Sequence, residues 1–199
     1  MPEYTRAYLD DVAQIASQLP VDRLEAMIAG LARVRDRGGR LFILGVGGGA
    51  GHASHAVNDF RKIAHLEAYA PTDNVSELTA RTNDDGWETT FSAWLRTSRL
   101  CERDAILVFS VGGGSREHGI SLNLVNAVEF AHEVGANVYG IVGRPDGTTA
   151  QLADEVIVVQ APGERQTPLV ESFQAVVWHL LVSHPALAAQ AGKWEAETA

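Results

Sequence analysis

Apolar residues recur along this chain in two patterns, a helical spacing at the start and short continuous runs after it. A spacing of three and four residues predicts amphipathic helices over 4–18 and 21–36. Their apolar stripes consist of Tyr8, Val12, Ile15 and Leu19, and of Leu24, Ile28, Leu31 and Val34. Gly38 and Gly39 follow the second segment, as glycine often does past the end of a helix. A pair of leading helices is therefore expected.

The rest of the chain alternates between apolar runs and helical segments. The predicted strands are 40–46, 66–70, 105–111, 137–142 and 155–160. The predicted helices lie over 49–65, within 83–100, from the glycines after 111 to about 135, between the last two strands, and over 167–183. Continuous apolar runs are typical of strands buried on both faces of a parallel sheet. The fold class is therefore α/β, a three-layer doubly wound sheet of five parallel strands with two additional N-terminal helices.

Length and composition exclude several classes of protein. The 199 residues are expected to form one domain, with a helical pair at 1–38, an α/β core at 39–185 and a tail at 186–199. No apolar run is long enough for a membrane span, and the N-terminus does not resemble a signal peptide. A single cysteine, Cys101, suits a reducing cytoplasm, where we expect the protein. A formal net charge of −9 at pH 7 argues against nucleic-acid binding.

Two predicted strands end in clusters of glycine. Gly45, Gly47, Gly48 and Gly49 follow the first strand, and Gly112 to Ser115 follow the third. Each cluster is expected to open a helix, whose N-terminal amides bind anions. Tight turns without a ligand are the alternative. The G-x-G-x-x-G spacing of dinucleotide-binding loops and the Gly-Lys-Ser/Thr of P-loops are missing, so we expect a sugar phosphate beyond the carboxyl ends of the strands.

Histidines and carboxylates stand on two of the predicted helices. His55 and Asp59 lie one turn apart after the first glycine cluster, a spacing that suits two ligands of one divalent metal, and His52 could join them. A solvated helix face is the alternative. Glu171 and His179 lie two turns apart in an apolar stretch, where an unpartnered polar group is costly to bury. A hydrogen-bonded structural pair is the alternative there.

Four segments together resemble the sugar isomerase (SIS) family of the phosphoheptose isomerase type. GVGGGAGHASHAVNDF from Gly45 is similar to the family's G-N-G-G-S-x-x-D-A-x-H-F-x-x-E/D, and TNDDGWETTFSAWL from Thr82 to its N-D-x-x-x-x-x-x-F. FSVGGGS from Phe109 stands where the family has S-T-S-G-N-S, and ESFQAVVWH from Glu171 has the spacing of Q-E-x-H-x-x-x-x-H. The resemblance covers nearly the whole chain.

This resemblance implies a ketose–aldose isomerase that acts on sedoheptulose 7-phosphate through an enediol. It implies one zinc ion per site held by His55, Asp59, Glu171 and His179, with Asp59 and His179 as the acid–base pair. The substrate-binding positions it implies are Gly47, Gly48, Gly49, Asn83, Asp84, Ser110, Gly112, Ser115 and Glu171. It also implies a homotetramer with sites between subunits, while charge and hydropathy argue against nucleic acid and membrane as partners.

This chain departs from the family pattern at its glycine loops. Val46 replaces an asparagine, Gly49 a serine, and Val111 and Gly112 a Thr-Ser pair, while Leu169 replaces a polar residue or arginine. Three hydroxyl donors to a phosphate are therefore missing, although backbone amides can still bind an anion. An isomerase of a different sugar phosphate and a non-catalytic sugar-phosphate-binding SIS protein of the replication-initiator-associated type remain alternatives.

Overall fold

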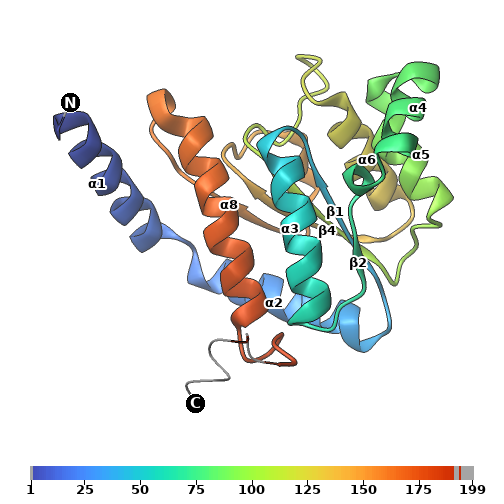
Figure 1. Cartoon of the computed structure of the whole chain (residues 1–199), viewed down its shortest axis with the longest axis horizontal. Helices are drawn as coiled ribbons and strands as arrows, with labels where there is room; N and C mark the ends of the chain where they lie inside the picture. Colours follow the sequence, from blue (N-terminus) through green and yellow to red (C-terminus); the bar gives the residue numbers. More distant parts are fainter. Residues whose placement is uncertain (1, 191–192, 194–199) are drawn as a thin grey trace.

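The computed structural model describes residues 2–190 and residue 193, and it shows two leading helices followed by strands that alternate with helices (Figure 1). The helices are α1 Pro2–Gln18, α2 Val21–Asp36, α3 Gly48–Lys62, α4 Val75–Asp85, α5 Thr90–Thr97, α6 Leu122–Glu133, α7 Thr148–Leu152 and α8 Gln166–Ser183. Short 3-10 helices are η1 Pro71–Asp73, η2 Trp87–Thr89 and η3 Gly163–Arg165. Of the expected tail, 186–190 lie in turns and bends, and the remainder except Lys193 lies outside the described residues.

The sheet is parallel throughout and confirms the predicted fold class. Its strands are β1 Leu41–Gly45, β2 Ala68–Tyr69, β3 Ala105–Ser110, β4 Asn137–Val142 and β5 Glu155–Val158, in the order β2-β1-β3-β4-β5. The register pairs Leu41 with Ala105 and Ala105 with Asn137, so the three central strands begin level with one another. Their carboxyl ends therefore lie at one edge, where both glycine clusters follow.

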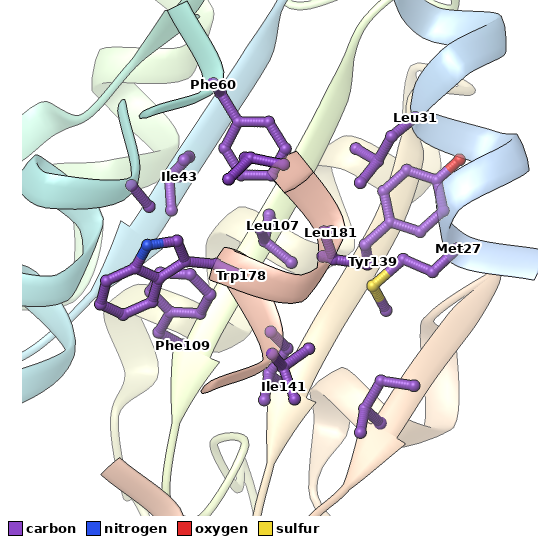
Figure 2. Packing of buried hydrophobic residues seen from close by; sticks show 14 of the residues in the cluster. Met27, Leu31, Ile43, Phe60, Leu107, Phe109, Tyr139, Ile141, Trp178 and Leu181 are labelled. Atoms are coloured by element: carbon purple, nitrogen blue, oxygen red, sulfur yellow. The ribbon is translucent and has the colours of Figure 1, made fainter. Parts of the chain in front are cut away.

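Alternate residues of each strand face two separate hydrophobic clusters. In β1, Leu41 and Ile43 pack beneath α2, α3 and α8, whereas Phe42 and Leu44 pack beneath α5 and α6. Figure 2 shows the first cluster, in which Trp178 of α8 lies beside Phe109 of β3. Burial of each large apolar side chain contributes about 1.5–3 kcal/mol. These two layers hold α3 and α8 on the same face of the sheet.

Helix α1 contacts this core along one face only. It projects away from the sheet, and Ile15 is its one buried residue (Figure 1). The apolar stripe predicted for this helix packs against the first hydrophobic cluster, with Tyr8, Val12 and Leu19 partly buried, whereas Tyr4 and Leu9 lie outside the stripe and expose 62% and 55% of their surface. An ion pair between Asp11 and Arg165 connects α1 to the start of α8.

Two helices begin at positions that the sequence patterns did not predict. Helix α4 forms over 75–85, where no helix was predicted, and the Asn74 side chain accepts a hydrogen bond from the Glu77 amide at its start. Helix α6 begins at Leu122, so the expectation that the second glycine cluster opens a helix directly was wrong. The chain first turns back on itself, with Ser115 and Ile120 paired in an isolated antiparallel bridge.

A buried ion pair joins the starts of two central strands. Asp104, before β3, accepts hydrogen bonds from the Arg40 backbone amide at 2.9 Å and from its guanidinium at 2.6 Å. Burial alone would raise the pKa of Asp104, but the hydrogen bonds from Arg40 outweigh it and hold that pKa below its usual value. The pair therefore stabilises the fold wherever Asp104 is ionised.

Candidate metal centre and substrate site

Helices α3 and α8 lie side by side and run in the same direction (Figure 1). Three contacts along them establish this. The Glu171 carboxylate lies beside Gly48, the His52 ring bonds to Gln174, and Asp59 bonds to Trp178. Each contact lies further along both helices than the one before. Parallel strands impose this arrangement, because each helix that follows a strand returns in the same direction.

Three predicted ligands meet where these helices face each other. One ligand atom from each of His55, Asp59 and His179 lies within 4.8 Å of the other two. Asp59 Oδ2 is 3.5 Å from His55 Nε2 and 3.4 Å from His179 Nε2. The Asp59 side chain is only 9% exposed, whereas those of the two histidines are 57% and 51% exposed. Asp59 therefore does not belong to a solvated helix face.

Neighbouring groups fix the orientation of the cluster. His179 Nδ1 lies 2.8 Å from the carbonyl oxygen of Ala175. A carbonyl oxygen only accepts, so this nitrogen carries the proton, and Nε2 of the neutral ring keeps its lone pair. Asp59 Oδ2 accepts from the Trp178 indole N–H at 3.0 Å, and Oδ1 accepts from the Asn58 amide at 2.9 Å. The lone pair and the carboxylate oxygen thus face each other.

These donors suit a divalent transition metal. Two imidazole nitrogens and a carboxylate are a ligand set that catalytic zinc sites use, with a further position left open. A backbone carbonyl behind a ligand histidine is the usual partner at such sites. The exposure of both histidines gives an ion and a substrate access from solvent. The cluster is therefore compatible with a metal site.

The fourth predicted ligand, Glu171, lies outside this three-residue cluster. Its carboxylate packs against Gly48 in the first turn of α3, where a Cβ would lie 2.6 Å from Oε2. An acidic group there is favourably placed at the positive end of the helix dipole. His52 also lies outside the cluster, and its Nδ1 is 3.0 Å from Gln174 Oε1. The role of Glu171 as a ligand stays a prediction.

The first glycine loop has no room for the serine that the family pattern places in it. A Cβ on Gly49 would lie 2.6 Å from the backbone carbonyl oxygen of Phe109, so any side chain there would displace β3. Gly47, just before α3, has a φ of 59°, a conformation that glycine adopts without strain. The missing hydroxyl at position 49 is thus a consequence of close packing between the loop and the sheet.

The second glycine loop is held by its own serines. The Ser110 hydroxyl accepts from the Gly113 amide at 3.0 Å, and Ser115 Oγ lies 3.0 Å from His118 Nδ1. At Gly112 an added Cβ would meet open space, so the backbone there is accessible to a ligand. The loop borders a cavity of about 360 Å³ whose other wall includes Arg144 and Gly147.

Polar residues at the start of α6 were missed by the sequence reasoning. Ser121 precedes this helix in a left-handed conformation and makes no side-chain capping hydrogen bond. Asn123 is fully buried in the first turn, and neither of its side-chain polar atoms has a partner within the described part of the chain. A serine before an apolar helical run is an N-cap signal that could have placed the helix start there.

Asn83 and Asp84 are not near the three-residue cluster in one copy of the chain. They occupy the last turn of α4, are exposed, and bond to each other at 2.7 Å. Helix α4 packs against η2 and α5, and its Leu78 joins the hydrophobic cluster on the opposite face of the sheet from α3 and α8. The predicted sugar-contacting pair therefore lies on the other side of the sheet.

Within residues 2–190 no helix is long and apolar enough to span a membrane. No protein-family model matches the chain. Among curated proteins, the chain is 32% identical over 169 residues to the phosphoheptose isomerase of Nitratidesulfovibrio vulgaris, an alignment that covers 82% of this chain and 76% of that protein. It is 31% identical over 191 residues to the lincomycin biosynthesis protein LmbN of Streptomyces lincolnensis, covering 90% and 68%.

Solved structures show the same fold. The phosphoheptose isomerase of Neisseria gonorrhoeae superposes with a TM-score of 0.79 at 24% identity, covering 91% of this chain and 97% of that one. The sugar isomerase domain of an RpiR transcription factor from Sphaerobacter thermophilus superposes with a TM-score of 0.60 at 19% identity, covering 92% and 88%. Fold and sequence likeness agree, and the chain belongs to the phosphoheptose isomerase family of sugar isomerase (SIS) proteins, a family of phosphosugar isomerases.

Proposed function

We propose that the chain is a metal-dependent ketose–aldose isomerase that converts sedoheptulose 7-phosphate to D-glycero-D-manno-heptose 7-phosphate through an enediol. The observation that carries this proposal is the meeting of His55, Asp59 and His179 between α3 and α8. The proposed ion is Zn²⁺, held by these three residues, with Glu171 as the further ligand that the family pattern implies. When bound, the ion would stabilise negative charge on adjacent substrate oxygens.

Asp59 and His179 are the proposed acid–base pair. Isomerisation removes a proton from C1 of the ketose and returns one to C2, while a hydroxyl proton moves between their oxygens. Asp59 Oδ2 and His179 Nε2 lie 3.4 Å apart, so both proton carriers face the same small volume. The Ala175 carbonyl holds the His179 ring in the orientation that this exchange requires.

The glycine loops support a sugar phosphate with contacts that differ from the family pattern. Gly49 is closed to a hydroxyl-bearing side chain, whereas the backbone of Gly112 is open. Backbone amides of these loops, with Ser110 and Ser115, are the proposed phosphate contacts. Asn123, buried in the first turn of α6 with no side-chain partner among the described residues, suits a polar ligand. The same differences favour a second candidate, isomerisation of another sugar phosphate.

A cytoplasmic homotetramer with sites between subunits is the proposed assembly. Asn83 and Asp84 lie across the sheet from the metal cluster, so a second copy would have to bring them to it. Two exposed histidines and the exposed Tyr4 and Leu9 of α1 leave surface available for such contacts. Light scattering on the purified chain measures the number of copies.

The test combines metal content with turnover. Protein purified without chelator is analysed for zinc and incubated with sedoheptulose 7-phosphate, and the sugar signals are followed by NMR. His179→Ala is compared with His132→Ala, a histidine exposed on α6 and outside the cluster. We expect near-stoichiometric zinc and a new aldose signal in the wild type and in His132→Ala, with both lost in His179→Ala.

Other outcomes separate the candidates. Zinc without turnover of this ketose would favour isomerisation of another sugar phosphate. Neither zinc nor turnover would refute the metal-dependent mechanism and leave a non-catalytic binding protein as the better account.

A further inference from the structure

Trp178 lies at the centre of the groups that surround the proposed metal centre. Its side chain is 1% exposed, and its ring contacts three histidine rings and one phenyl ring. The ring centroids lie 5.1 Å from His52, 5.4 Å from His55, 4.7 Å from His179 and 5.7 Å from Phe109. Figure 2 shows the indole beside Phe109, at one side of the hydrophobic cluster. One side chain therefore connects the sheet to both helices of the site.

The indole N–H bonds to the carboxylate oxygen that faces the histidines. Trp178 Nε1 donates to Asp59 Oδ2 at 3.0 Å, and the same oxygen lies within 3.5 Å of Nε2 of both His55 and His179. An indole is a donor with no acceptor atom, so it does not compete with the carboxylate for a cation. One lone pair of Oδ2 is thereby occupied, and the other is directed toward the cluster.

A pair of polar residues behind the indole holds it in place. His52 packs on one part of the ring, and its Nδ1 is 3.0 Å from Oε1 of Gln174, which is fully buried on α8. Phe109 of β3 supports the indole from the sheet. The indole is thus confined from both helices and from the sheet, which keeps the N–H aimed at Asp59.

We propose that Trp178 is a positioning residue that fixes Asp59 Oδ2 toward His55 and His179. The proposal rests on the proposed metal centre and extends it, because the family pattern quoted for the last helix leaves the position of Trp178 unspecified. Partners of this kind, bonded to a ligand rather than to the ion, typically change metal affinity or activity by about 10- to 100-fold when removed.

Trp178→Phe removes the N–H and retains an aromatic ring. Trp94→Phe is the matched control, because Trp94 packs against Phe42 on the opposite face of the sheet. We expect Trp178→Phe to bind zinc about 10- to 100-fold more weakly and to lose a similar factor in kcat, with KM changed less than about threefold. Trp94→Phe is expected to retain the wild-type zinc affinity.

The indole resonance provides a measurement that does not depend on activity. The chain has four tryptophans, and Trp178→Phe identifies the indole N–H signal of Trp178 by removing it from the ¹H–¹⁵N spectrum. We expect that signal to shift when zinc is added to the wild type, and to shift in the zinc-free protein when Asp59 is changed to Asn. If Trp178→Phe fails to fold, Trp87→Phe, Trp94→Phe and Trp194→Phe assign the signal by elimination.

Each result decides the proposal. Two results would overturn the positioning role alone. One is a zinc affinity of Trp178→Phe within threefold of the wild type. The other is a Trp178 indole N–H signal whose chemical shift changes neither on adding zinc nor in Asp59→Asn. A wild-type protein that binds no zinc would overturn the proposed metal centre and the positioning role with it.

Discussion

Replacing Gly48 with alanine should displace Glu171 without altering its chemistry. A Cβ at position 48 would lie 2.6 Å from Oε2 and 2.7 Å from both Cδ and Oε1 of that carboxylate. To reach an ordinary contact distance of about 3.5 Å, the carboxylate must move by about 0.9 Å. Gly48 is not among the positive-φ glycines, so alanine is compatible with its backbone and favours the helix by up to about 1 kcal/mol.

The expected result is a loss of activity in a protein that remains folded. Misplacement of a site group by about 1 Å can reduce the rate by about 100-fold, so we expect kcat/KM of Gly48→Ala to fall 10- to 100-fold. Its melting temperature should stay within a few degrees of the wild type, and zinc should be retained because His55, Asp59 and His179 would still hold the ion after the proposed further ligand, Glu171, is displaced. The assay is isomerisation of the sugar phosphate that the wild type converts.

Gly51→Ala is the matched control on the same helix. A Cβ at position 51 meets no atom within 4 Å, so this variant should retain wild-type activity. Glu171→Gln keeps the size of the side chain and removes its charge. It therefore tests the effect of the charge separately from the effect of the position. Full activity in Gly48→Ala would refute the argument that the position of Glu171 matters, and weaker zinc binding in this variant would support Glu171 as the further ligand.

Three further outcomes test the fold itself. Gly30→Ala should lower the free energy of unfolding by about 1–2 kcal/mol, because its Cβ would lie 2.9 Å from Cζ of the buried Tyr139 ring. Urea titrations measure this change, and a variant more stable than the wild type would contradict the packing. Asp104→Asn should cost about 3 kcal/mol at pH 7 by breaking the buried pair with Arg40. Because the pKa of Asp104 is lowered from 3.8, that stabilisation is present above about pH 4 and lost below it, so unfolding curves that stayed far apart at low pH would argue against the pair. Burial raises the pKa of Tyr139 to about 12. Its neutral form therefore stabilises the fold below about pH 10, and this contribution is lost as the pH rises toward 12. Ultraviolet titration should show one tyrosine that ionises at a higher pH than the others, and this late titration step should be missing in Tyr139→Phe.

Much of the fold could be predicted from the sequence, because buried parallel strands are apolar along their whole length. Runs such as 40–46 and 105–111 are distinct from the helical segments between them, and the sheet follows from their alternation. Helix α4 could not be recognised in the same way, since none of its residues is buried and its sequence therefore lacks an apolar stripe. The late start of α6 depends on the turn at 115–120, which only the bridge between Ser115 and Ile120 reveals.

The candidate site was predictable where spacing on one helix determined proximity. His55 and Asp59 are one turn apart, so their meeting followed from the helix alone. That His179 joins them depends on how α8 lies against α3, and the family resemblance supplied that information. The hydrogen bond from Trp178 to Asp59 could not be predicted, because a tryptophan in an apolar helix is indistinguishable in sequence from an ordinary core residue.

The parallel sheet has an electrostatic consequence for the capture of an anionic substrate. Helices α3, α6 and α8 all begin at the carboxyl edge of the sheet, so their positive ends attract an anion there, but only within about one helical turn. At longer range, a chain with a net charge of −9 repels the same anion. Salt screens the distant repulsion more than the short-range attraction. The association rate of a sugar phosphate should therefore rise with moderate ionic strength, opposite to the behaviour of enzymes that steer anions with surface lysines and arginines.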